Sequence, residues 1–72
     1  MKESFAIEVD CANCAAKVEA AVAKLPGVTA ATVNYFAQRL YLEWEDGLER
    51  KKLIKQIRKE GRRIEPDFEI EE

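Results

Sequence analysis

The sequence predicts an α+β fold in which two helices pack on one face of a four-stranded antiparallel sheet. Three observations predict it: strand-like alternation of apolar residues, two segments with helical apolar spacing, and turn residues between these segments. The chain has 72 residues. We therefore expect a single domain covering residues 1–72, because so short a chain cannot build a second core.

The first half of the chain predicts a strand, a helix and a second strand. Apolar and polar side chains alternate over residues 5–9, which is typical of a half-buried strand. From Cys14 to Leu25 the apolar residues fall on one face of a helix. Pro26-Gly27 ends that helix, because glycine suits a left-handed turn and proline cannot continue the hydrogen bonds. Residues 28–34 are rich in β-branched side chains and predict the second strand.

The second half adds a strand, a helix and a final strand. Residues 40–45 alternate again after a loop at residues 35–38. Residues 48–60 predict the second helix, with Gly61 as its stop. The last strand is expected around Ile64, Phe68 and Ile70, and Pro66 within it fits an edge strand, where a missing N–H is harmless. This βαββαβ order predicts the ferredoxin-like sandwich.

Composition and charge exclude several classes of function. The net charge is −2, whereas a nucleic-acid-binding domain carries a basic surface, so we expect no nucleic-acid partner. No apolar run approaches the ~20 residues of a membrane span, so this segment should not insert into a membrane. We therefore expect a cytoplasmic domain, where thiols stay reduced.

Two cysteines and no histidine define the chemistry that the sequence allows. Cys11 and Cys14 are separated by two residues and lie where a strand gives way to a helix. The partial positive charge of a helix N-terminus favours thiolates, and thiolates are ligands for soft metal ions. A structural zinc site needs about four protein ligands. Two thiols make an open site, which suits a metal carrier better than a structural site.

Asp10 and Arg62 are the other candidates for this site. Asp10 directly precedes Cys11, so its carboxylate could be a third, harder ligand that favours Zn(II), Cd(II) or Pb(II) over Cu(I). The alternative is that Asp10 caps the helix or is a solvated loop charge. Arg62 follows the second helix and could offset the charge of a loaded site as a neighbour of the ligands. It could equally serve the helix dipole.

Two other functional classes remain as alternatives. A thiol–disulfide oxidoreductase also places Cys-x-x-Cys at the start of a helix, but the thioredoxin fold needs a longer chain. The cysteines could also be incidental in a ferredoxin-like interaction module. We expect no enzymatic activity from the domain itself.

The segment Cys11-Ala12-Asn13-Cys14-Ala15-Ala16-Lys17-Val18-Glu19, followed by Leu25-Pro26-Gly27-Val28 and Val33-Asn34, resembles the heavy-metal-associated domain. This family has the βαββαβ fold, and its cysteines carry metal to or within a heavy-metal-transporting P-type ATPase. Aspartate before the first cysteine resembles the branch of these pumps that exports zinc, cadmium and lead.

The resemblance implies a metal-binding domain on the cytosolic face of a membrane transporter, most simply an N-terminal domain of a zinc, cadmium or lead pump. Its partners would be transmembrane or other cytosolic domains of that P-type ATPase. A copper(I) chaperone or copper-pump domain is the alternative. Two departures from the family pattern are Glu8-Val9 in place of Gly-Met, and Arg62 after the late glycine. Two ligands per chain would also allow a metal-bridged dimer.

Overall fold

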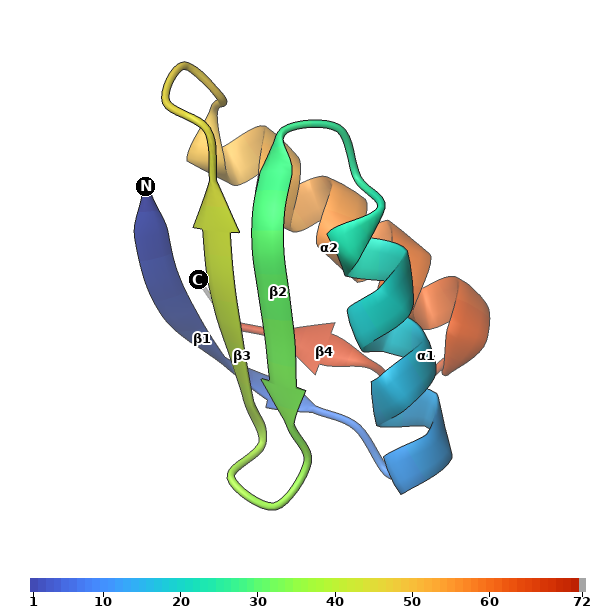
Figure 1. Ribbon diagram of the computed structural model, residues 1–72. Coiled ribbons are helices and arrows are strands. Elements are labelled where there is room, and N and C mark those ends of the chain that lie inside the picture. Colours follow the sequence, from blue (N-terminus) through green and yellow to red (C-terminus); the bar gives the residue numbers. More distant parts are fainter. Residues whose placement is uncertain (72) are drawn as a thin grey trace.

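A computed structural model describes residues 1–71 and contains the six expected elements in the expected order (Figure 1). These elements are β1 (Lys2–Glu8), α1 (Ala12–Ala23), β2 (Val28–Asn34), β3 (Arg39–Trp44), α2 (Arg50–Ile64) and β4 (Glu69–Ile70). Among these residues, neither helix is long and apolar enough to cross a membrane.

The sheet is antiparallel, with the strand order β2-β3-β1-β4. Both helices lie on the same face of this sheet, behind the strands in Figure 1. The predicted ferredoxin-like sandwich is therefore confirmed. β4 pairs only with β1, so it forms one edge of the sheet, as the proline in this region predicted.

The core lies between the sheet and the two helices. Alternate residues of β1 and β3 point into it, and each helix buries one face. The buried apolar residues are Phe5, Ile7, Val9, Ala15, Val18, Val22, Leu40, Leu42, Trp44, Leu53, Ile54, Ile57, Phe68 and Ile70.

The prediction that Gly61 stops the second helix is wrong. The helix begins at Arg50 rather than Leu48 and continues through Gly61 to Ile64. Gly61 is needed for close packing instead, because a Cβ placed on it would lie 2.6 Å from Cε2 of the Phe68 ring. The glycine therefore lets the chain return tightly across the helix.

The last strand is shorter than predicted. Ile64 belongs to α2, and the chain turns before β4 begins at Glu69. In this turn the Phe68 N–H donates to the carbonyl oxygen of Glu65 at 2.9 Å. Pro66 lies in the turn rather than within a strand, because the turn needs no N–H from that position.

Candidate metal centre

The cysteines lie at the junction that the sequence predicted. β1 ends at Glu8 and α1 begins at Ala12, so residues 9–11 form the connecting loop. Cys11 is the N-cap residue of α1, in an extended conformation with φ −138° and ψ 130°. Cys14 lies in the first turn of the helix. Both thiols are free, Cys11 is exposed, and Cys14 is partly buried.

The two thiols differ in their acidity. The backbone N–H of Cys14 is the largest influence that lowers the pKa of Cys11, followed by the Cys14 thiol, the N–H of Asn13 and the charge of Lys17. The pKa of Cys14 is raised, first because its thiol shares a hydrogen bond with Cys11 and then because it is desolvated. The helix N-terminus thus stabilises the thiolate of Cys11, as expected for a metal ligand or nucleophile.

The β2–β3 hairpin supports the loop that carries the cysteines. The side-chain oxygen of Gln38 accepts the Val9 N–H at 2.8 Å, and the Gln38 carbonyl accepts the Ile7 N–H at 3.0 Å. The Tyr35 hydroxyl donates to the carbonyl oxygen of Asp10 at 3.3 Å. Gln38 has a positive φ of 52°. These contacts hold the start of the loop, and sequence reasoning did not identify Gln38 because they are tertiary.

Asp10 lies beside two other acids. Carboxylate oxygens of Asp10, Glu65 and Asp67 all lie within 4.8 Å of one another. Within residues 1–71, no such group of three combines the Asp10 carboxylate with both thiols. The side chain of Asp10 does not cap α1 either, because the N-cap is Cys11. The role of Asp10 as third ligand therefore stays a prediction.

Arg62 makes contacts away from the cysteines. It lies in the last turn of α2, where its guanidinium donates to the Phe68 carbonyl at 3.2 Å and to the Glu69 carboxylate. These contacts fasten β4 to the end of α2. A role for Arg62 beside a loaded metal site stays a prediction that no contact described here supports.

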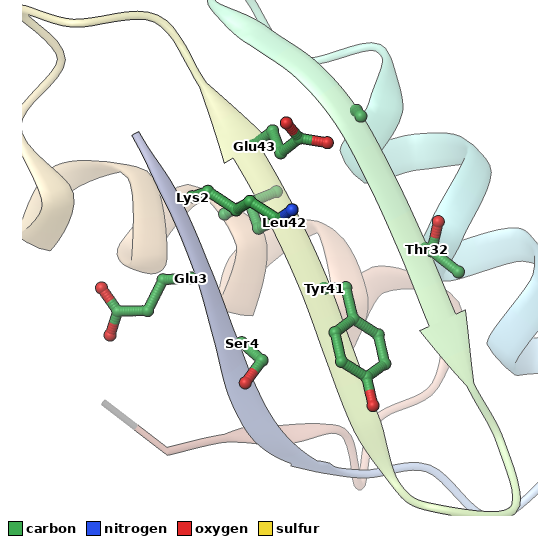
Figure 2. Close-up of a pocket in the computed structure, with 8 residues that line it drawn as sticks. Lys2, Glu3, Ser4, Thr32, Tyr41, Leu42 and Glu43 are labelled. Carbon is green, nitrogen blue, oxygen red and sulfur yellow. The ribbon is translucent and has the colours of Figure 1, made fainter.

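The sheet also has a shallow depression of about 240 Å³. Lys2, Thr32, Tyr41 and Glu43 border it on the outer face of the sheet, opposite the helices (Figure 2). It contains neither cysteine nor Asp10. The depression is therefore separate from the residues that the sequence singled out.

Comparison with known families identifies the family of this chain. Residues 4–63 match the heavy-metal-associated domain. The chain belongs to the heavy-metal-associated domain family. Domains of this family bind metals and act as carriers rather than as catalysts, which agrees with the two free thiols at the start of α1.

Three similar proteins differ in their identity to this chain and in how much of each protein the match covers. The nitrogen fixation protein FixI from Bradyrhizobium diazoefficiens is 39% identical over 88% of this chain, which spans only 9% of that protein. A copper binding domain from HMA7, a P-type ATPase, is 27% identical with a TM-score of 0.73, covering 97% of this chain and 89% of that one. The CopZ metallochaperone is 19% identical with a TM-score of 0.75, covering 99% and 100%.

The family match supports heavy-metal binding by the domain but does not single out zinc, cadmium or lead. The name of the HMA7 domain refers to copper. The copper alternative raised from the sequence fits the comparisons at least as well as the divalent metals do.

Proposed function

We propose that this heavy-metal-associated domain binds one soft metal ion through Cys11 and Cys14 and passes it on by thiolate exchange. The observation that carries the proposal is the position of the two free thiols, one exposed on the loop and one in the first helical turn. An ion held by two thiolates at the surface leaves room for an incoming ligand. A thiolate of the partner can therefore bind the ion before Cys11 and Cys14 release it.

Copper(I) is the ion that this arrangement favours. Cu(I) is soft and is satisfied by two sulfur ligands, so it needs no carboxylate. The carboxylate of Asp10 lies with those of Glu65 and Asp67 instead of completing a three-ligand set with the thiols. The relationship to a copper binding domain of a P-type ATPase supports the same choice.

Zinc(II), cadmium(II) or lead(II) is the second candidate, with Asp10 as the third ligand. Asp10 is exposed and precedes Cys11 directly, so rotation of its side chain would bring a harder ligand to the thiols. Tetrahedral divalent ions need more ligands than two sulfurs supply. A metal-bridged dimer, in which a second copy adds two thiolates, would meet the same need.

We further propose that the partner is a P-type ATPase and that this domain works at the cytosolic face of such a pump. The domain would deliver metal to the pump or regulate it, and transport itself would belong to the larger protein. The relationship to the HMA7 domain supports this partner. The short match to a much longer relative is consistent with a domain of a larger chain.

Metal titrations of the reduced domain test the proposal. Cu(I) affinity would be measured by competition with a coloured chelator, and Cd(II) affinity by thiolate-to-metal absorbance. Wild type would be compared with Asp10→Ala and with a Cys11→Ser/Cys14→Ser variant. Asp46→Ala is the matched control, because Asp46 is an exposed aspartate far along the chain from the cysteines.

We expect one Cu(I) per chain, no tight Cu(I) binding after loss of both thiols, and Cu(I) affinity unchanged by Asp10→Ala. Cd(II) binding that weakens about tenfold in Asp10→Ala, or ~1.4 kcal/mol, but not in Asp46→Ala would favour the divalent candidate. Retention of tight metal binding without the cysteines would refute both candidates.

A further inference from the structure

Three acids form a cluster beside the cysteine loop. Asp10 comes from the β1–α1 loop, whereas Glu65 and Asp67 come from the turn between α2 and β4. Their carboxylate oxygens lie within 4.8 Å of one another. Oxygen ligands this close can be shared by one cation. The fold therefore brings together three acids from two separate segments.

Glu65 is the decisive member of this cluster. The residue is only 9% exposed, and its Oε2 atom is buried without a hydrogen-bond partner. The other oxygen, Oε1, accepts the Asp67 N–H at 3.3 Å. A buried carboxylate oxygen without a partner is costly, and ligation of a cation is one way to satisfy it.

The neighbouring arginines are engaged with other acids. Arg62 pairs with Glu69 across the start of β4, and Arg63 pairs with Glu60 one helical turn earlier at 3.4 Å. Neither ion pair includes a carboxylate of the cluster. Arg62 and Arg63 thus form ion pairs with acids outside the cluster.

We propose that Asp10, Glu65 and Asp67 form a second metal site, which binds a divalent cation that prefers oxygen ligands. Carboxylates are the ligands that Mg²⁺, Ca²⁺ and Mn²⁺ favour, whereas thiolates select soft ions. The mostly buried carboxylate of Glu65 provides a fixed ligand, and the exposed carboxylates of Asp10 and Asp67 supply further ligands from two different segments. Water completes the coordination on the exposed side.

This site extends the proposed function without depending on which ion the thiols hold. Asp10 is shared between the two sites, since it follows β1 and immediately precedes Cys11. A cation bound to Glu65 and Asp67 holds the Asp10 carboxylate away from the thiols. Occupation of the oxygen site then removes the third ligand that a zinc or cadmium ion would use, and leaves two sulfurs that suit Cu(I).

Mn²⁺ alone is the probe that tests the site. Because Mn²⁺ is paramagnetic, it broadens amide signals near the place where it binds in a ¹H–¹⁵N spectrum of the reduced 72-residue chain. We expect substoichiometric Mn²⁺ to broaden the amide signals of residues 10, 11, 65, 67 and 68 first. The affinity for Mn²⁺, measured from the free-ion signal in electron paramagnetic resonance, should fall roughly tenfold or more in Glu65→Gln.

Three further variants make the test specific. Asp67→Asn changes an exposed residue and should weaken Mn²⁺ binding without disturbing the fold. Glu8→Gln removes the same charge from an exposed glutamate at the end of β1 and should leave Mn²⁺ binding unchanged. The Cys11→Ser/Cys14→Ser variant should also bind Mn²⁺ as the wild type does, although it loses Cu(I).

Several results would overturn the oxygen site. Wild-type Mn²⁺ affinity in Glu65→Gln would mean that the ion does not use the buried carboxylate. Broadening spread over all acidic segments would mean general charge attraction. Loss of Mn²⁺ binding in the double cysteine variant would place the ion on the thiols. Failure of Cu(I) to bind would refute the proposed function while leaving the Mn²⁺ result intact.

Discussion

Replacing Gly61 by alanine should destabilise the domain, although alanine favours helices more than glycine does. Gly61 is a buried residue of α2, and its missing side chain faces the Phe68 ring. A Cβ at this position would lie 2.6 Å from Cε2 and 2.7 Å from Cγ of that ring, distances that real Cβ contacts essentially never show. The ring is completely buried, so it cannot swing into solvent to relieve the clash.

The expected magnitude follows from two opposing terms. Alanine in a helix interior gains about 1 kcal/mol over glycine. Overpacking a well-filled core costs about 1–3 kcal/mol. The upper end applies here because the new Cβ would clash with several atoms of the buried Phe68 ring. The net loss should be about 2 kcal/mol, which corresponds to a fall of roughly 8–16 °C in Tm for a domain of this size.

Thermal and urea unfolding of Gly61→Ala would measure this loss, with fluorescence of the buried Trp44 as the probe. The double variant Gly61→Ala/Phe68→Leu should recover part of it, because a smaller side chain leaves room for the new methyl group. The loss in the double variant should then be less than the sum of the two single losses. A Gly61→Ala protein as stable as the wild type would refute the packing argument.

Two predictions concern pH. Iodoacetamide should modify Cys11 before Cys14 near neutral pH, because the pKa of Cys11 is lowered by the N–H of Cys14 and that of Cys14 is raised. Lys17→Gln should slow the modification of Cys11, because the charge of Lys17 also lowers its pKa. Equal rates of modification of the two cysteines, followed by mass spectrometry, would contradict these pKa directions. The pKa of Glu3 is lowered by its hydrogen bonds from Arg50. The pair therefore stabilises the fold at pH values above the ordinary pKa of 4.5, and this stabilisation is lost as the pH falls through the lowered pKa. The stability difference between wild type and Glu3→Gln in urea should therefore shrink from pH ~7 to pH ~3; a constant difference would exclude the pair as its cause.

The two strands of the β2–β3 hairpin were predictable because β-branched composition and alternation are local properties of the sequence. Residues 28–34 form β2 with the expected bounds, and alternation in residues 40–45 marks β3 to within one residue at each end. The end of α2 was not predictable in the same way. Glycine after an apolar periodic segment usually signals a helix stop, but Gly61 serves close packing against Phe68, and only the tertiary structure contains that contact.

The candidate site, too, was only partly predictable from the sequence. The position of Cys11 and Cys14 at the start of a helix follows from a short segment, and the structure places them there. Glu65 could not be found in this way, since it approaches Asp10 only when the α2–β4 turn folds back. No local pattern distinguished Glu65, because the segment around Pro66 was expected to be an edge strand.

The attachment of the β2–β3 hairpin connects an exposed aromatic ring with the loop that carries Cys11. Phe36 at the tip of the hairpin is 96% exposed, and its neighbours Tyr35 and Gln38 are hydrogen-bonded to Asp10 and Val9. The exposed tip of the hairpin and the residue before Cys11 are thus joined by the Tyr35 hydroxyl, outside the core. A substitution at the hairpin tip would therefore be felt first by the loop that carries Cys11.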